Sequence, residues 1–453
     1  MNERSSTIGA QEPDEPTTTG LTPRAITRIA VTELFGYLNY DLHTEASDHE
    51  FSKLFILYGE NGSGKTRLLQ AVYHLLSPAM NRGHRKRLAE LPFLRLSVAI
   101  SGGCSIVVSR AKAETGDYSV YCDCPDIDAP FEVSYLVKDG EFGSDEEERR
   151  FKAFLRKLNI QIYLLSAERS FASDVLPNED RTITHSRDHL GRIIRREYDA
   201  PEFAQPHPLT HAMSAVTEYI RGKSRRATAM GSVNANAIYS EVISSIAKVG
   251  PVVADQANLE SLRMRLFELS DRSKAFAELK MIAPLKSDDL DKGLIEADVS
   301  KANLVSSVLT PYLDSIQAQL NALQPAQKLV STLLKTANDF LIGKKLRFTI
   351  PAGLYLTSRG STLDPTLLSS GEQHLLLMFC YVIIAQNRQT IFIIDEPEIS
   401  LNIKWQSKIL QSLLKLSGDA PMQFLLATHS IELISEYIEG VVRLPPYKHE
   451  DAF

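Results

Sequence analysis

The stretch GENGSGKT, residues 59–66, constrains this chain of 453 residues more than any other part of its sequence. It fits the pattern G-x-x-x-x-G-K-[S/T], and it lies between an apolar segment, LFILY, and a segment with helical spacing, RLLQAVYHLL. Glycines let a loop wrap around a phosphate without Cβ clashes, and backbone amides at a helix start present a positive dipole to it. We therefore expect a strand, a phosphate-binding loop and a helix, with ATP or GTP bound at the loop.

The residues of this loop have distinct expected roles. Lys65 can reach the β- and γ-phosphates, and the Thr66 hydroxyl can ligate Mg²⁺. The residues expected to surround the phosphates are Asn61, Gly62, Ser63, Gly64, Lys65, Thr66 and Arg67. The alternative is a glycine turn that only precedes a helix, and it predicts none of this chemistry.

A second apolar segment, IFII at residues 391–394, ends in two acids. A run without alternation is typical of a strand buried on both faces, as in a parallel sheet. Ligands of α/β sheets bind at the carboxyl edge, where both acids would emerge. We expect Asp395 to hold Mg²⁺ through water and Glu396 to act as the general base on the attacking water. The alternative is a strand that ends in two solvated acids.

The segment MQFLLATHS, residues 422–430, has the pattern of another buried strand, and it delivers His429 at its end. The imidazole could there hydrogen-bond the γ-phosphate and report whether it is present. A lone histidine at a strand end is usually structural, which is the alternative. Its position after Asp395 and Glu396 in the chain favours the sensor role.

Residues 367–379, LLSSGEQHLLLMF, open an apolar helix. Ser369 and Glu372 have the S-x-x-E spacing of a capping box, which satisfies the free amides at a helix start. A serine hydroxyl and exposed amides at a helix start also suit an anion. The segment is therefore a cap alone or part of a nucleotide site, and the two interpretations are compatible.

The rest of the chain suggests how these motifs are organised. Alternating segments between 92 and 137 predict an antiparallel sheet beside a parallel core. From about 171 to 345 the pattern is mostly helical, with a flexible loop expected at 221–236. We expect a disordered tail at 1–24, an N-terminal part of the nucleotide-binding domain at 25–170, a helical insertion at 171–345 and a C-terminal part at 346–453.

Charge and cysteine content narrow the environment of the protein. A net charge of −6 excludes the whole chain as a polyelectrolyte partner for nucleic acid. The basic stretches at 81–87, 187–198 and 221–226 could still contact DNA phosphates, or they are solvated faces. The longest apolar run, residues 375–385, is too short to span a membrane and predicts a buried helix. The few cysteines favour free thiols in a reducing cytoplasm over disulfides or a zinc site: Cys104, Cys122, Cys124 and Cys380.

In combination and order, the segments GENGSGKT, LSSGEQ, IFIIDEPEISLN and ATHS resemble the motifs of the ABC-type ATPase family. The resemblance covers both ends of the chain, roughly 25–110 and 345–440. It implies an α/β fold, an ABC-type P-loop ATPase head with a mixed parallel core sheet, an antiparallel β-subdomain and a large helical insertion. It also implies Mg²⁺-dependent ATP hydrolysis in which Glu396, His429 and Lys65 are catalytic.

By this resemblance the signature motif comprises Leu368, Ser369, Ser370, Gly371 and Glu372. In the family this segment completes the ATP site of the opposing subunit. The resemblance therefore implies an ATP-sandwich dimer or a larger homo-oligomer. In such an assembly Ser369 and Gly371 of one copy face the phosphate loop of the other.

The chain departs from the family pattern in two places. Asn402 stands where the loop after the acidic strand end usually has Asp. No clear glutamine follows the antiparallel sheet, and Glu168 and Arg169 are the candidates for its linking role. Three aromatic residues are candidates either to stack on adenine or to fill the core: Phe35, Tyr37 and Tyr40.

The large insertion argues against a transporter subunit. The segments SAERS, DFLIGKKLRF and DEPEISLNIKWQ look most like the OLD/RecF/SMC-like branch, and within it like ATPase subunits of bacterial anti-phage systems such as PARIS and Septu. This resemblance implies a cytoplasmic sensor or scaffold ATPase that controls a separate nuclease or toxin effector. The alternatives are a DNA-repair or chromosome-type clamp that uses the basic stretches, and an ATP-gated scaffold with little turnover.

Overall fold

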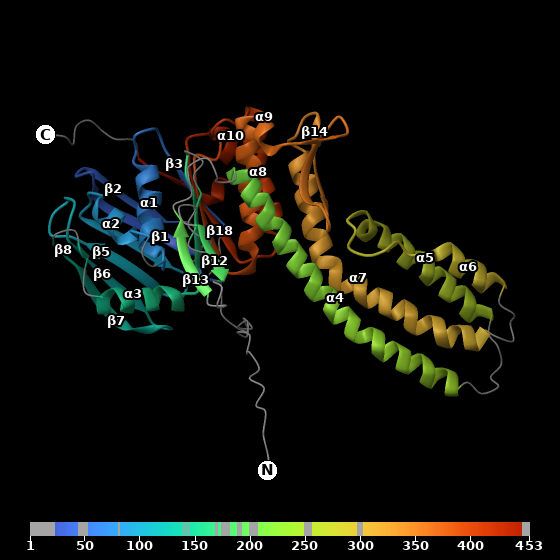
Figure 1. Ribbon diagram of the computed structural model, residues 1–453. Coiled ribbons are helices and arrows are strands. Elements are labelled where there is room, and N and C mark those ends of the chain that lie inside the picture. Colours follow the sequence, from blue (N-terminus) through green and yellow to red (C-terminus); the bar gives the residue numbers. More distant parts are fainter. Residues whose placement is uncertain are drawn as a thin grey trace, which may run out of the picture.

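A computed structural model describes residues 23–43, 53–79, 82–138, 141–142, 145–167, 171–173, 182–187, 193–198, 207–248, 256–296 and 302–445. Within these residues, two six-stranded sheets lie side by side, and a bundle of long helices extends away from them (Figure 1). We call the sheets and their covering helices the head, and α4 to α7 the arm.

The core of the head is a mostly parallel sheet with the order β11-β10-β17-β18-β3-β19. Its parallel strands are β10 (Gln161–Leu165), β17 (Thr390–Asp395), β18 (Met422–Thr428), β3 (Leu54–Tyr58) and β19 (Val441–Arg443). At one end, β11 (Phe171–Ser173) pairs antiparallel with β10. Every residue of β17 and β18 is buried, as their unbroken apolar runs predict. Because the central strands run the same way, their carboxyl ends meet at one edge of the sheet.

Helices and a second sheet bury both faces of this core. Successive strand residues point to opposite faces, so Ile391 and Ile393 join the cluster around α1 (Lys65–Leu76), whereas Phe392 joins the cluster around α8 (Ser370–Ile384). The remaining head helices are α2 (His84–Ala89), α3 (Asp145–Lys157), α9 (Ile403–Ser417) and α10 (Ile431–Ile434), with short 3₁₀ turns η2 (Pro365–Leu367), η3 (Ala385–Asn387) and η4 (Ile438–Gly440).

The second sheet of the head is antiparallel throughout, as the alternating pattern predicts. Its order is β2 (Leu38–His43), β1 (Ile26–Leu34), β4 (Arg95–Ile100), β5 (Cys104–Ser109), β6 (Tyr118–Cys124) and β7 (Asp128–Tyr135). Smaller sheets are formed by β8 (Val137–Lys138) with β9 (Glu141–Phe142), and by β14 (Lys344–Thr349), β15 (Gly353–Ser358) and β16 (Ser361–Leu363). The fold class is therefore α/β, with a parallel core sheet beside an antiparallel one.

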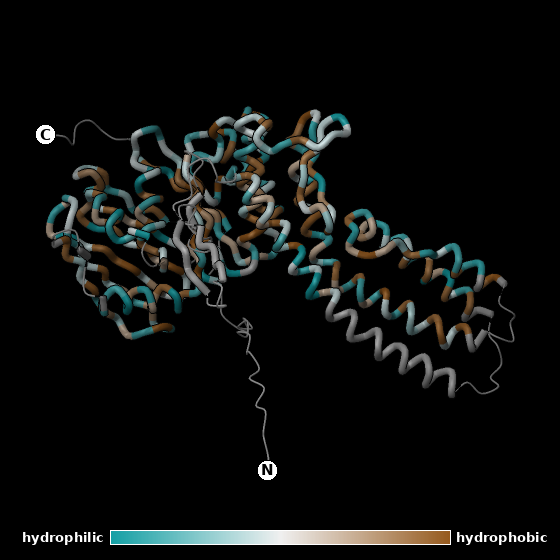
Figure 2. The backbone as a smooth tube through the Cα atoms, viewed as in Figure 1, coloured by the Kyte–Doolittle hydropathy of each residue, from teal (hydrophilic) through white to brown (hydrophobic). Residues whose placement is uncertain are grey.

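The arm comprises α4 (Pro208–Lys248), α5 (Gln256–Glu278), α6 (Ser287–Glu296) and α7 (Ala302–Asn338). Leucines from α5 and α7 form its own apolar core, among them Leu266, Leu313 and Leu320. Hydrophobic and hydrophilic segments alternate along α5 and α7, the pattern of amphipathic helices that pack against each other (Figure 2). Among the described residues, no helix combines the length and the apolar character that crossing a membrane requires.

The insertion, expected to be mostly helical, differs from the expectation in two regions. Residues 182–187 and 193–198 form an antiparallel pair, β12 (Thr182–Arg187) with β13 (Ile193–Tyr198), and β11 lies upstream of them. Residues 221–236, expected as a loop, lie inside α4. Packing of α4 against α7 outweighs the low helix propensity of glycine, serine and asparagine in that stretch. The domain boundaries remain a prediction, and the tail before residue 23 lies outside the described residues.

The expectation of free thiols is wrong for two of the four cysteines. Cys104 and Cys124 form a disulfide bond, whereas Cys122 and Cys380 are free and buried. Cys104 begins β5 and Cys124 ends β6, and the register of these antiparallel strands places the two residues opposite each other. The pairing depends on that register, which the cysteine spacing does not reveal.

The basic stretch at 81–87 contains an arginine that faces inward. The buried Arg85 guanidinium donates to the carbonyl oxygens of His74 (2.6 Å), Leu75 (3.1 Å) and Ser77 (2.9 Å), at the end of α1. Its Nε lies 3.8 Å from a carboxylate oxygen of Glu148. Arg85 therefore satisfies the last carbonyls of α1 and is not available to a phosphate.

We expect Arg85→Met to lower the free energy of unfolding by about 2–4 kcal/mol, because the carbonyls of α1 and the Glu148 carboxylate lose a partner. Lys86→Met, which removes an exposed charge from the same stretch, should change it by less than about 0.5 kcal/mol. Urea unfolding followed by circular dichroism measures both. Equal effects of the two substitutions would contradict this role for Arg85.

Candidate nucleotide site

The phosphate loop joins β3 to α1 in the order that the sequence predicts. Gly62 and Gly64 have φ angles of +85° and +77°, a conformation that residues with a side chain rarely adopt. A Cβ on Gly64 would also lie 3.2 Å from side-chain atoms of Leu34 and Leu38. Glycine is thus required at residue 64 both by the backbone conformation and by the close packing of β1 and β2.

Lys65 holds its ammonium group inside the loop. Its Nζ donates to the carbonyl oxygens of Gly59 (2.8 Å) and Glu60 (2.9 Å), and it lies 3.8 Å from Oε1 of Glu396. A phosphate in the loop would offer the same ammonium group charged oxygens in place of neutral carbonyls. The lysine is therefore positioned for the role that the motif predicts.

Asp395, at the end of β17, is 2% exposed, and neither carboxylate oxygen accepts a hydrogen bond of ordinary length. Burial raises the pKa of Asp395, while the nearby Thr66 hydroxyl and the Lys65 charge lower it. Asp395, Thr66 and Ser166 line a cleft of about 590 Å³. A buried carboxylate without a partner, beside a hydroxyl, fits the oxygen ligands that Mg²⁺ prefers.

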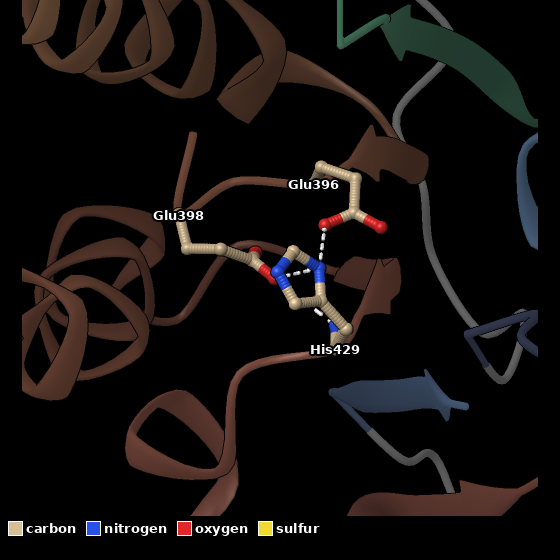
Figure 3. Close-up of side chains that lie close together, drawn as sticks. All are labelled: Glu396, Glu398 and His429. Carbon is tan, nitrogen blue, oxygen red and sulfur yellow. Dashed lines mark hydrogen bonds and ion pairs between the residues drawn. The ribbon is translucent and has the colours of Figure 1, made fainter. Parts of the chain in front are cut away.

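Glu396, Glu398 and His429 form a cluster in which both carboxylates point toward the imidazole (Figure 3). Nδ1 of His429 contacts Oε2 of Glu396 and lies 3.3 Å from Oε1 of Glu398. The same oxygen of the buried Glu398 accepts hydrogen bonds from the Thr428 hydroxyl and from the backbone N–H of His429. Glu398 thus fixes the end of β18 and orients the histidine between two acids.

The environment of Glu396 suits a proton acceptor. Burial and the neighbouring Glu398 carboxylate raise the pKa of Glu396 to about 7, although His429 acts in the opposite direction. A general base is most effective when its pKa lies near the working pH. The backbone of Glu396 has a φ of +52°, a strained conformation of the kind that is concentrated at functional sites.

The capping box at the start of α8 is present as the spacing predicts. Glu372 accepts hydrogen bonds at 2.8 Å from both the backbone N–H and the hydroxyl of Ser369. A Cβ on Gly371 would lie 2.5 Å from the carbonyl oxygen of Ser400, in the loop after β17. Glycine at residue 371 therefore lets the start of α8 approach the edge of the sheet where Asp395 and Glu396 emerge.

Comparison with known proteins agrees with these features. The chain matches the family described as "AAA domain, putative AbiEii toxin, Type IV TA system" over residues 54–435. The chain belongs to this family. It is a family of P-loop ATPases, whose members generally use ATP and Mg²⁺. No curated protein matches the chain.

Solved structures similar to this family member include two heads of SMC proteins. One is the Smc head domain from Pyrococcus furiosus with an extended coiled coil, bound to the C-terminal domain of ScpA, with 13% identity, a TM-score of 0.39 and 93% of each chain covered. The other is the SMC head domain from Thermotoga maritima, with 11% identity, a TM-score of 0.29 and coverage of 93% of this chain and 99% of that chain.

The P-loop ATPase chain brings most of the expected site residues together, but not all of them. Lys65, Thr66, Asp395, Glu396 and His429 converge at the carboxyl edge of the core sheet. In the part of the chain that the structure describes, no hydrogen bond or ion pair joins 369–372 to the phosphate loop. Ser369 and Ser370 are exposed to solvent instead.

The departures from the family pattern have local explanations. The Asn402 side chain accepts a hydrogen bond from the backbone N–H of Trp405 at 3.0 Å and so caps α9, a role that Asn and Asp fill equally well. Tyr40 is buried, and its hydroxyl donates to the Ser63 carbonyl at 2.9 Å, so it supports the loop. Phe35 and Tyr37 are exposed and Phe35 lines the cleft, so adenine stacking stays a prediction for these two residues. Glu168 and Arg169 lie outside the described residues.

Two basic side chains of the stretch at 221–226 make internal contacts, whereas Arg225 and Arg226 are exposed. The Arg221 guanidinium donates to the carbonyl oxygens of Ile350 (2.9 Å) and Pro351 (2.7 Å), and Lys223 lies over the Tyr219 ring. These contacts attach α4 to the turn between β14 and β15. The side chains of 187–198 lie outside the described residues.

Two residues of the site were not expected from the sequence. Glu398 follows Pro397 in the DEPE segment, and a third acid close after the first two is a signal that could have identified it. Lys344 binds Glu372 through both carboxylate oxygens, at 2.8 and 2.7 Å. The two residues are 28 positions apart, and no local pattern indicates that contact.

Glu396 predicts a pH dependence of stability. Its pKa is about 7 in the folded chain against an ordinary value of 4.5, so folding is favoured by the protonated form. The stability from this group is present below pH 4.5 and is lost as the pH rises through 7. We therefore expect the free energy of unfolding of Glu396→Gln to increase relative to that of the native chain as the pH rises from about 5 to about 8.

Urea unfolding of both proteins at the two pH values, without nucleotide or Mg²⁺, measures the difference. In a Glu398→Ala background the gain should shrink, because one cause of the raised pKa is removed. A stability difference that is the same at both pH values would contradict the assignment.

Proposed function

We propose that this chain hydrolyses ATP with Mg²⁺ at sites shared between two copies. The observation that carries the proposal is the convergence of a phosphate-loop lysine, a buried carboxylate without a partner and an acid–histidine pair at one edge of the core sheet. Membership of a P-loop ATPase family supports it.

Each residue has a distinct task in this reaction. Lys65 and the loop amides bind the β- and γ-phosphates, and Thr66 with Asp395 would hold Mg²⁺, which supplies charge neutralisation when it is bound. Glu396 accepts a proton from the water that attacks the γ-phosphorus, as the bond from phosphorus to the bridging oxygen breaks. His429 is held between Glu396 and Glu398, from where it can contact the γ-phosphate.

The exposed start of α8 supports a site shared between two copies. Ser369 and the first amides of α8 point to no group of the same chain's phosphate loop, although they lie at the same edge of the sheet. Three aliphatic side chains beside the site motifs are also exposed: Leu367 (67%), Ile403 (67%) and Ile431 (64%). Exposed apolar side chains around a polar site are typical of an interface, and a second copy supplies the missing serine.

We further propose that the chain is the sensor or scaffold ATPase of an anti-phage defence complex, with a separate nuclease or toxin as effector. The family description, which names a toxin and a type IV toxin–antitoxin system, supports a role in such systems. The arm, which extends from the head (Figure 1), carries exposed apolar residues such as Met264 and Phe267 and is the part that we assign to the effector. Arg85 and Arg221 make internal contacts and are not available to a DNA clamp, although Lys86, Arg87, Arg225 and Arg226 are exposed.

We expect Glu396→Gln to lower steady-state phosphate release by about 10²- to 10⁴-fold, because the general base is lost, with ATP binding retained. Glu439→Gln, an exposed glutamate outside the cluster, is the matched control and should keep the native rate. A coupled phosphate assay measures turnover, and fluorescent-nucleotide titration measures binding. Equal rates for the native chain and Glu396→Gln would instead indicate a scaffold with little turnover.

A second prediction concerns the shared interface. In the Glu396→Gln background with ATP, light scattering should show dimers or larger assemblies, and Ile431→Asp should return them to single chains because it buries a charge. Ile438 is 72% exposed and precedes β19, so it lies at the opposite edge of the core sheet. Ile438→Asp should therefore leave assembly unchanged. Single chains under all conditions, or equal effects of both substitutions, would contradict the interface.

A further inference from the structure

The hydroxyl of the signature serine is already engaged within its own chain. Ser369 Oγ donates to Oε2 of Glu372 at 2.8 Å, and the backbone N–H of Glu372 donates back to Ser369 Oγ at 3.4 Å. A serine hydroxyl carries a single proton. As long as Glu372 accepts it, Ser369 cannot donate that proton to a phosphate.

Lys344 binds the same carboxylate. Its Nζ donates to both oxygens of Glu372, at 2.8 and 2.7 Å, and the Glu372 carboxylate is almost entirely buried. Burial raises the pKa of Glu372, but the hydrogen bonds from Lys344 and Ser369 lower it by more than burial raises it. The pKa therefore lies below its ordinary value, and the carboxylate stays ionised. An ammonium group on both oxygens weakens the attraction of the carboxylate for the serine proton.

The position of Lys344 is set by the arm. Lys344 begins β14, just after α7 ends at Asn338, and the Asn338 side chain pairs with the backbone of Leu346 through bonds of 3.0 and 2.7 Å. Phe340, in the connection, packs its ring against Phe379 of α8 and Trp405 of α9, with centroids 5.7 Å apart in both pairs. The end of α7, the lysine and α8 therefore form one packed unit.

We propose that Lys344 is a positioning residue: by balancing the Glu372 carboxylate it weakens the hydrogen bond that Glu372 accepts from Ser369, so that a phosphate held by a second copy can accept that hydrogen bond instead. The inference rests on the proposed function. A movement of the arm that withdraws Lys344 strengthens the hydrogen bond from Ser369 to Glu372 and so removes a donor from the site. The arm thereby gains control over turnover without contacting the nucleotide.

The test compares ATP turnover and ATP binding in Lys344→Met, Ser369→Ala and the double variant. Lys344→Met should lower kcat by roughly 10- to 100-fold, the scale of losing one donor to a developing charge, with the ATP dissociation constant unchanged. The double variant should be no slower than Ser369→Ala, because both substitutions remove the same hydrogen bond. Lys345→Met, one residue along and exposed, should match the native chain.

A variant without the Glu372 charge tests whether Lys344 acts through Glu372. Glu372→Gln keeps the capping box and leaves no charge for Lys344 to balance. The double variant Lys344→Met, Glu372→Gln should therefore have the same kcat as Glu372→Gln alone. This pair also lacks a lone buried charge, which keeps the test available if Lys344→Met does not fold. A multiplied loss in the Lys344→Met, Ser369→Ala double variant would overturn the inference.

The outcomes also distinguish this inference from the proposed function. If Glu396→Gln and Ser369→Ala lower kcat while Lys344→Met keeps the native rate, the shared ATPase site stands and the role of Lys344 is wrong. If Glu396→Gln releases phosphate as fast as the native chain, the proposed function fails, and the role of Lys344 fails with it.

Discussion

The carboxylate of Asp395 is buried at the end of a strand that is itself buried on both faces, and no hydrogen bond of ordinary length reaches either oxygen. Burying an ionised group without a partner destabilises a fold by several kcal/mol unless a counter-charge or a bound cation compensates. Here Lys65 and the Thr66 hydroxyl lie nearby and lower the pKa of Asp395, but they compensate only in part. A cation bound with a triphosphate would balance the rest of the Asp395 charge, so ligand binding would stabilise this carboxylate in its buried position.

The parallel core sheet explains why the rest of the site forms around this residue. Its central strands deliver the phosphate loop, Glu396 and His429 to one edge, and the close contact of Gly371 with Ser400 brings the start of α8 to that edge as well. The serine there has no partner in its own phosphate loop, and in the proposed shared site a second copy uses it. The arm joins the head beside that serine. The proposed interface between copies, the proposed ATPase site and the arm assigned to the effector therefore meet in one region.

The sequence predicted what depends on local chemistry. The loop at 59–66, the buried strands and the capping box each follow from residues close together in the chain, and the structure has them. Contacts between distant segments could not be predicted in this way: the disulfide of Cys104 and Cys124 depends on strand register, and the Lys344 contact depends on how α7 meets α8. The expected loop at 221–236 failed because helix packing outweighed local propensity.

Mixing two inactive variants tests the shared site most directly. Lys65→Ala removes the lysine that binds the phosphates, and Ser369→Arg blocks the start of α8 at its N-cap serine. Each variant alone should therefore have almost no ATP turnover. In an equal mixture, half of the dimers contain one site with an intact loop from one copy and an intact serine from the other, and we expect about a quarter of the native rate. A mixture as inactive as its components would show that loop and serine do not act across two copies, and would contradict the account.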